Sequence, residues 1–381
     1  MGAPLIAMVA GEASGDFLGA HLIEALKSSI PGARFAGIGG PKMQSAGFES
    51  WFDLEKLAVR GYVEVLRHYA EITRIRRQLR RRLIAEAPAL FIGVDAPDFN
   101  LDLEASLKRR GVPTVHYVSP SIWAWRRTRL RHIARAVNQM LVLFPFEVPI
   151  YRQANIPVAY VGHPLADAIE LEDCTATARE QLRLSGERPV LALLPGSRQS
   201  ELKYMAATFV RTAKLVHEML PQAHFLVPLV SRETRELFES TLYTEEGQEL
   251  PLTILFGHAR EAIAASDAVL VASGTATLET ALYGKPMVVT YKMADLSWTI
   301  MSRMRYQPYV GLPNIIAGEF IVPELLQEDA TPENLAQALV NVHNDPVIRR
   351  RLPERLGAIH RSLRQDTAAR AAAAVLPWLK R

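Results

Sequence analysis

The sequence predicts an α/β protein made of two doubly wound parallel-sheet domains. Short apolar runs alternate with longer amphipathic helical patterns, which is typical of parallel strands joined by crossover helices. A polar, Ala/Glu-rich segment at residues 166–188 interrupts this alternation once, and the alternation then begins again. With 381 residues, the chain is too long for one compact core and long enough for two domains.

The expected elements of the first half are strands at residues 5–10, 35–38, 89–94, 114–118 and 139–143, and helices at 17–29, 64–86, 101–110 and 124–136. Those of the second half are strands at 190–194, 225–228, 252–255, 268–272 and 287–290, and helices at 202–220, 259–265 and 276–283. These elements predict a first domain at 1–165, a linker at 166–188, a second domain at 189–345 and a helical C-terminal segment at 346–381. The C-terminal segment is expected to pack on the first domain or on a partner subunit.

Composition limits the classes of function. The chain is 49% hydrophobic and 22% charged without a low-complexity tract, so it is neither disordered nor fibrous. Lys and Arg outnumber Asp and Glu by 44 to 40, an excess too small to argue for a nucleic-acid partner. Cys174 is the only cysteine, which fits a reducing compartment. No signal-peptide pattern is present, and no window approaches the ~18 apolar residues of a membrane span. We therefore expect a soluble or peripheral protein.

Four turns that follow expected strands are rich in Gly, Ser and Thr: residues 11–16, 39–41, 195–198 and 273–279. Glycine lets the backbone approach a ligand, and the N–H groups that begin the next helix attract anions. The alternative is that these residues merely turn and cap the chain. Neither the Rossmann fingerprint nor the P-loop is present, which disfavours a dehydrogenase or a P-loop NTPase. The pattern favours a diphosphate held by Gly196, Ser197, Arg198, Ser273, Gly274 and Thr275, with Glu279 placed for ribose hydroxyls.

Asp95 follows the strand expected at 89–94. A carboxylate at the carboxyl end of a parallel strand is where a general base for a sugar hydroxyl is needed. The alternative is a helix-capping or turn-forming Asp, which is the better reading for Asp98 because it follows Pro97. The histidines show no metal-ligand spacing, so no metal site is expected.

The stretch after residue 62 has helical spacing of apolar residues and a basic opposite face. A basic amphipathic helix suits the surface of an anionic membrane. A core-packed helix with a solvated basic face is the alternative, and nucleic-acid binding is a third reading that lacks any recognised motif. The candidate membrane patch comprises Val63, Val65, Leu66, Tyr69 and Ile72.

Six segments together are specific to one family: residues 9–16, 93–100, 116–125, 194–198, 272–279 and 308–314. They closely resemble the lipid A disaccharide synthase family, in order and at sensible spacings. The resemblance implies the GT-B fold, in which two Rossmann-like domains face a central cleft. It also implies a reaction between UDP-2,3-diacylglucosamine and 2,3-diacylglucosamine 1-phosphate that gives the β-1,6-linked disaccharide 1-phosphate and UDP. The anomeric centre inverts, and no metal cofactor is expected.

Carried over by position, the resemblance assigns Asp95 and Glu12 to catalysis and Arg198 to the departing diphosphate. It adds Asn314 to the donor-binding residues, and Ser14, Gly15, Asp16 and Asp98 are candidates for the acceptor loops. It further implies a homodimer, and a cytoplasmic enzyme at the inner face of the inner membrane, on anionic lipids. The nearest rivals are the peptidoglycan N-acetylglucosaminyltransferase and a UDP-sugar epimerase. A non-catalytic membrane- or nucleic-acid-binding protein is the rival from another class.

Overall fold

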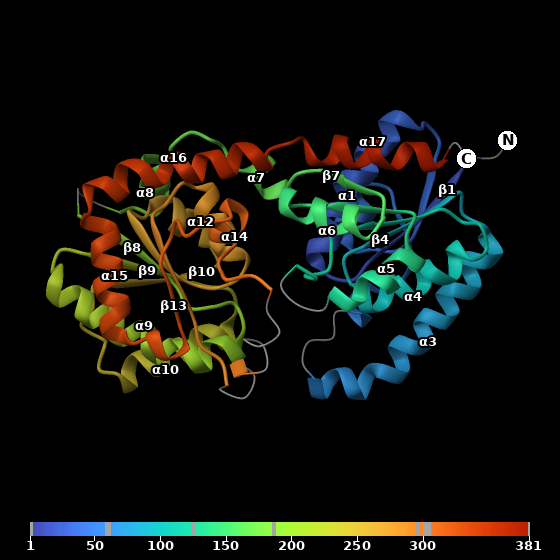
Figure 1. Cartoon of the computed structure of the whole chain (residues 1–381). Helices are drawn as coiled ribbons and strands as arrows, with labels where there is room; N and C mark the ends of the chain where they lie inside the picture. The colour runs from blue at the N-terminus through green and yellow to red at the C-terminus, as the bar shows by residue number, and fades with distance from the viewer. Residues whose placement is uncertain are drawn as a thin grey trace. The chain divides into compact units, whose positions relative to one another are not determined.

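A computed structural model describes residues 3–57, 62–123, 127–184, 188–294, 298–299 and 306–379. The chain forms two compact units (Figure 1). The first unit comprises Met1–Asp167 together with Leu363–Arg381, and the second comprises Ala168–Ser362.

The first unit contains a parallel sheet of seven strands in the order β3-β2-β1-β4-β5-β6-β7. Its strands are β1 (Leu5–Ala10), β2 (Arg34–Ile38), β3 (Glu49–Phe52), β4 (Leu90–Val94), β5 (Thr114–Tyr117), β6 (Gln139–Val142) and β7 (Val158–Tyr160). Its helices are α1 (Ala13–Ser29), α2 (Pro41–Ser45), α3 (Tyr62–Glu86), α4 (Pro97–Lys108), α5 (Leu130–Ala136), α6 (Val148–Gln153), α7 (Pro164–Ala168) and α17 (Thr367–Leu379), with short 3₁₀ turns η1 (Leu54–Lys56), η2 (Arg127–Arg129) and η3 (Pro145–Glu147).

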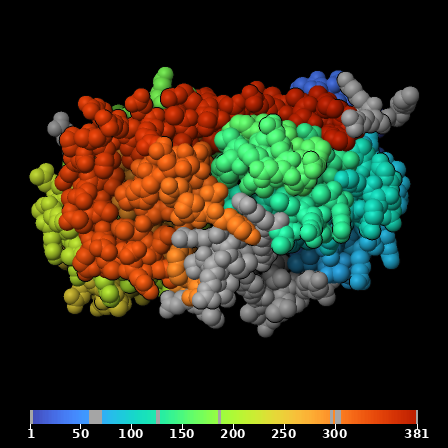
Figure 2. Space-filling model, viewed as in Figure 1, coloured from blue at the N-terminus to red at the C-terminus, as the bar shows by residue number. Residues whose placement is uncertain are grey.

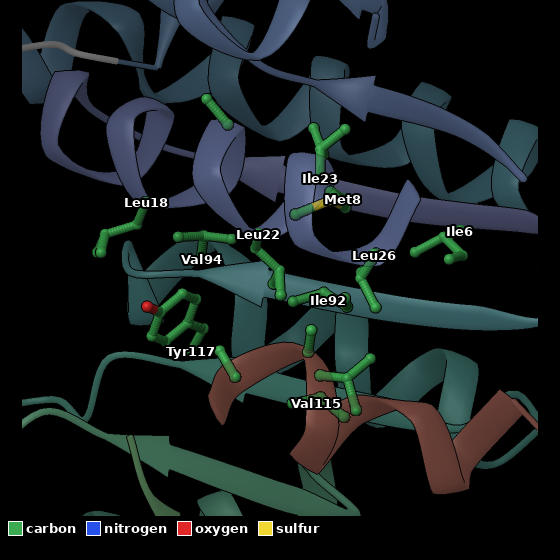
Figure 3. Packing of buried hydrophobic residues seen from close by; sticks show 14 of the residues in the cluster. Ile6, Met8, Leu18, Leu22, Ile23, Leu26, Ile92, Val94, Val115 and Tyr117 are labelled. Atoms are coloured by element: carbon green, nitrogen blue, oxygen red, sulfur yellow. The ribbon is translucent and has the colours of Figure 1, made fainter. Parts of the chain in front are cut away.

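The core of this unit forms where α1 covers the central strands. Leu18, Leu22, Ile23 and Leu26 recur at helical spacing along α1, so they share one buried face. They pack with apolar side chains of β1, β4 and β5 (Figure 3). All six residues of β1 are buried, as expected for a strand covered on both faces of a parallel sheet.

The second unit repeats the design with six parallel strands in the order β10-β9-β8-β11-β12-β13. Its strands are β8 (Val190–Leu194), β9 (His224–Leu229), β10 (Leu252–Phe256), β11 (Ala268–Ala272), β12 (Met287–Tyr291) and β13 (Glu324–Leu326). Its helices are α8 (Thr175–Gln181), α9 (Gln199–Met219), α10 (Arg232–Thr244), α11 (Ala259–Ala265), α12 (Thr275–Leu282), α14 (Leu312–Ala317), α15 (Pro332–Asn344) and α16 (Pro346–Leu363), with the 3₁₀ turn η4 (Gln327–Asp329). Atoms of α15 and α16, in red, form part of the surface of this unit in Figure 2.

Each sheet reverses its strand order once, between β1 and β4 in the first unit and between β8 and β11 in the second. In doubly wound sheets, ligands bind outside the carboxyl ends of the strands at this reversal. The turns after β1 and β4 contain Glu12 and Asp95, and the turns after β8 and β11 contain Arg198 and Ser273. The fold therefore places the predicted loops where this architecture accommodates a ligand.

The structure divides the chain differently from the expected domain boundaries. Most of the segment expected as a linker at 166–188 belongs to the second unit, because Ala178 of α8 is buried and packs with Val190 and Leu226. The expected C-terminal segment at 346–381 is also divided, since α16 lies in the second unit up to Ser362 and α17 lies in the first. Within the described ranges, no helix is long and apolar enough to cross a membrane.

Candidate functional site

The turn after β4 has an unusual backbone. Asp95 and Ala96 have positive φ angles of 55° and 44°. Left-handed conformations are uncommon for residues other than glycine, cost about 1–3 kcal/mol when strained, and gather at functional sites. The side chain of Asn100 holds this turn, because its Nδ2 donates to the carbonyl oxygens of Asp95 (2.8 Å) and Val9 (3.2 Å).

Glu12 lies in the neighbouring turn. Because Gly11 has no side chain, the turn after β1 can lie close to the turn after β4. A Cβ atom at Gly11 would lie 2.3 Å from the Cβ of Ala96. Glu12 is exposed at the N-cap of α1, and its side chain makes no capping bond. The structure therefore brings the loops of the two predicted catalytic carboxylates into contact.

A surface pocket of about 350 Å³ lies beside Asp95. Ser119, Ser121 and Arg129 also line it, and so does Val118, whose φ angle of 82° is a further left-handed backbone. Arg129 bonds Asp98 at 2.5 Å, and 83% of the Asp98 side chain is exposed. The predicted acceptor residue Asp98 thus lies at the surface, paired to a cation of the pocket.

A buried network supports the wall of this pocket. The hydroxyl oxygen of Ser119 lies 2.7 Å from that of Tyr151. Burial raises the pKa of Glu147 to about 8, although its hydrogen bonds with the Phe144 N–H and with Ser119 oppose this shift. Sequence reasoning missed this network because Glu147 follows an ordinary apolar strand.

Ser14, Gly15 and Asp16 lie in the first turn of α1, which begins four residues earlier than expected. Asp16 is 3% exposed and accepts hydrogen bonds from the backbone N–H groups of Gly40 (2.8 Å), Lys42 (3.0 Å) and Met43 (3.0 Å). Its carboxylate is therefore occupied in fixing the start of α2. Ser14 is exposed, and Gly15 is buried where a Cβ would lie 3.2 Å from the Val94 carbonyl oxygen.

We expect Asp16→Ala to lower the free energy of unfolding by roughly 3–5 kcal/mol, because three N–H groups, two of them in buried hydrogen bonds, lose their charged acceptor. Chemical denaturation measures this loss. Ser14→Ala, two residues earlier on the exposed face, is the matched control and should change stability by less than about 0.5 kcal/mol. Equal stability of the two variants would refute this structural role for Asp16.

In the turn after β8, two backbone amides converge on the carboxylate of Glu201. Gly196 has a φ of 131°, and the N–H groups of Ser197 and Arg198 both point to Oε2 of Glu201, at 2.9 and 3.2 Å. The Arg198 side chain is 72% exposed, and its Nη1 lies 3.4 Å from Oε1 of Glu201. Sequence reasoning overlooked Glu201, although a Glu three residues after an N-cap is a known capping signal.

The turn after β11 presents further polar groups. Gly274 and Thr275 are exposed, and Ser273 is half-buried. Glu279 lies one turn along α12, where Oε1 is 3.4 Å from Nε of Arg260. These residues and Gly196–Arg198 lie in the turns that follow β11 and β8, the two strands at the strand-order reversal of the second unit.

Asn314 is placed differently from the other predicted donor residues. It is 0% exposed, and its side chain bonds the backbone of Ile321 and Val322 as well as Glu324. Glu324 in turn accepts from the N–H groups of the segment that precedes α14. Asn314 therefore fixes the course of this segment and is not positioned as an exposed ligand.

The candidate membrane patch is only partly described. The side chains of Val63, Val65, Leu66 and Tyr69 lie outside the described set, and Ile72 is half-buried against the core. Ile75, Leu79 and Leu83 continue the apolar face of α3, and all three are buried. The second half of α3 therefore packs on the sheet, as the core-helix alternative predicts.

The basic face of α3 converges with α4. Arg76, Arg77 and Arg80 line a surface pocket of about 320 Å³ together with Arg109, the residue that directly follows α4. Asp102 is the acidic residue that lines this pocket, and its Oδ2 lies 3.0 Å from Nη1 of Arg76. This face therefore carries an excess of positive charge. In the part of the chain that the structure describes, no group of three or more His, Cys, Asp or Glu residues is placed to hold a metal ion.

Comparisons with a family model and with curated proteins point to the same family. The family model described as lipid-A-disaccharide synthetase matches residues 6–375. The chain is 57% identical to the lipid-A-disaccharide synthase of Dechloromonas aromatica and 50% identical to that of Neisseria meningitidis serogroup B; the alignments cover 98% of this chain and 98% and 97% of those chains.

Solved structures share the fold at low sequence identity. UDP-GlcNAc 2-epimerase from Neisseria meningitidis, bound to UDP-GlcNAc, matches with a TM-score of 0.66, 12% identity, and coverage of 98% of this chain and 99% of that chain. HepE from Anabaena, in complex with UDP and glucose, matches with a TM-score of 0.57 and 14% identity, again over 98% and 99% of the chains.

Proposed function

Because the chain belongs to the lipid-A-disaccharide synthetase family, we infer that it is a GT-B glycosyltransferase of lipid A biosynthesis. It joins UDP-2,3-diacylglucosamine to 2,3-diacylglucosamine 1-phosphate through a β-1,6 linkage and releases UDP. The observation that carries this conclusion is the family match over residues 6–375. The placement of the polar loops at both strand-order reversals supports it.

In the proposed mechanism the 6-hydroxyl of the acceptor attacks the anomeric carbon of the donor in one displacement, which inverts that centre. Asp95 takes the hydroxyl proton as the general base, and Glu12, in the neighbouring turn, is the second carboxylate assigned to catalysis. The breaking bond leaves negative charge on UDP. The Arg198 side chain and the backbone amides of the Gly274 turn stabilise this charge. Glu279 accepts from the ribose hydroxyls.

An assay with both acylated substrates in detergent micelles tests the reaction. Release of UDP should match formation of a disaccharide 1-phosphate, identified by mass spectrometry. Release of UDP without the disaccharide would indicate another acceptor. No turnover by folded protein would contradict the proposed function.

We propose that the reaction requires no metal ion, as the family resemblance implies. Turnover should then be unchanged, within about twofold, after dialysis against EDTA, because the Arg198 guanidinium and backbone amides of the Gly274 turn stabilise the departing diphosphate in place of a metal ion. The same rate measured with and without added Mg²⁺ is the check. A loss of turnover in EDTA that Mg²⁺ restores would overturn the proposal.

We also propose that the enzyme is cytoplasmic and lies peripherally on the inner face of the inner membrane. Both substrates carry acyl chains, so the acceptor has to be collected from a lipid surface. The arginine pocket between α3 and α4 supports this, since guanidinium groups bind lipid phosphates and are attracted to anionic lipids.

A triple variant tests the membrane contact: Val65→Ser, Leu66→Ser and Tyr69→Ser. Its binding to vesicles with phosphatidylglycerol should fall at least ~10-fold, because each apolar side chain contributes about 1.5–3 kcal/mol when buried. Ile72 is left intact because it packs on the core. The control replaces Leu171, Tyr243 and Val347, exposed apolar residues of the second unit, with Ser. Equal co-sedimentation of both variants would contradict the patch.

A homodimer is the remaining proposal from the resemblance. Sedimentation equilibrium of the purified chain gives its mass directly. A single species of one chain at micromolar concentration would contradict the dimer.

A further inference from the structure

The pocket beside Asp95 is called here the Asp95 pocket. Among the described residues that line it, Arg129 is the only one with a basic side chain. It ends η2 (Arg127–Arg129), directly before α5, and its side chain is 25% exposed. A guanidinium group carries five N–H donors, and the bond from Nη2 to Asp98 engages one nitrogen of the group. Arg129 therefore retains donors for a second anion.

The partner of Arg129 is easily replaced. The Asp98 side chain is 83% exposed, and surface ion pairs of this kind are weak. A phosphate monoester has more negative charge than a carboxylate and three acceptor oxygens, so it suits the fork of an arginine better. An incoming phosphate would either displace Asp98 from the Arg129 guanidinium or bind the guanidinium together with Asp98.

The pocket has two charged side chains, Asp95 and Arg129, and the acceptor sugar has one group that suits each of them. Its 6-hydroxyl needs a base, and its 1-phosphate, on the other side of the ring oxygen, needs a cation. Asp95 and Arg129 both line the same pocket of about 350 Å³. This volume lies within the ~300–1,000 Å³ of small-molecule sites.

We propose that Arg129 binds the 1-phosphate of the acceptor and thereby selects a phosphorylated acceptor, with Asp98 as its counterion in the empty pocket. This assignment rests on the proposed function and adds a specificity residue to it. Binding of the phosphate by Arg129 would also orient the 6-hydroxyl toward Asp95.

The test compares two acceptors that differ only in the phosphate: 2,3-diacylglucosamine 1-phosphate and 2,3-diacylglucosamine. Wild type should prefer the phosphorylated acceptor in kcat/KM by about 10- to 100-fold, the range that a hydrogen bond to a charged group provides. Arg129→Ala should lose most of this preference, with kcat/KM for the phosphate-free acceptor changed by less than about threefold. Arg129→Lys should retain part of it, because it keeps the charge but not the fork.

Asp98→Asn is the companion variant and should act in the opposite direction. It removes the competing carboxylate, so the KM for the phosphorylated acceptor should fall about two- to fivefold. Unfolding midpoints of all three variants should match wild type, which separates misfolding from lost recognition.

The outcomes distinguish the two proposals. If wild type turns over neither acceptor, the proposed function is wrong. If wild type makes the disaccharide but Arg129→Ala slows both acceptors equally, or neither, the assignment of Arg129 is overturned and the function stands. The same conclusion follows if wild type does not discriminate between the acceptors.

Discussion

Asp95→Asn should reduce kcat by about 10²–10⁴-fold, the usual contribution of a general base. Asparagine is chosen because it tolerates the left-handed backbone that Asp95 adopts at a φ of 55°. The turn, with its bond from Asn100, should therefore persist while the proton acceptor is lost. The rate of disaccharide formation at saturating substrates measures the effect.

The pH dependence of this variant provides a second readout. Wild-type kcat should fall at acidic pH as the base is protonated, and Asp95→Asn should lack this acidic limb. The matched control is Asp102→Asn, because Asp102 lies in α4, pairs with Arg76 and does not line the Asp95 pocket. An acidic limb that survives in Asp95→Asn would exclude Asp95 as the base and direct attention to Glu12.

Arg198→Ala should lower kcat by about 10²–10³-fold, because it removes a charged donor from the departing diphosphate. The side chain is 72% exposed and contributes little packing, so stability should change by less than about 0.5 kcal/mol. Steady-state kinetics with varied UDP-sugar separates a loss in kcat from a rise in KM. Arg198→Lys should recover part of the rate, since it keeps the charge but not the paired donors.

Lys203→Ala is the matched control for Arg198, since it removes an exposed cation from the first turns of α9, the helix that Arg198 caps. It should leave kcat within about twofold. A uniform loss in both variants would indicate that α9 acts through its overall charge. An unchanged rate in Arg198→Ala would remove Arg198 from the mechanism.

The buried strands of both sheets were predictable from sequence, because β1, β4, β8 and β11 are continuous apolar runs. The edge strands β3, β7 and β13 were missed. They are short, only partly buried and mixed in composition, so no run of apolar residues marks them. Helix α10 was also missed, since just two of its residues, Thr234 and Phe238, are buried.

Sequence identified the polar residues of the turns but not the direction in which they point. Asp16 and Asn314 lie in segments specific to the family, yet both side chains bond backbone groups of their own unit. Arg129 carried no local signal, because its place beside Asp95 depends on the pairing of β4 with β5. The roles of Asp95, Glu12 and Arg198 remain predictions that the variants above test.

Helix α17 follows the second unit in the chain but belongs to the first unit. Ala371, Ala372 and Val375 of α17 are buried in the same cluster as Ile6 and Met8, and Asp167 accepts from the N–H groups of residues 365–367. On the ribosome, the second unit is complete once Ser362 has emerged, whereas the first unit still lacks part of its core. Domains usually mature from the N-terminus during translation. Here the nascent chain reverses that order, so a chain interrupted after Ser362 would contain the whole second unit but would lack part of the core of the first unit.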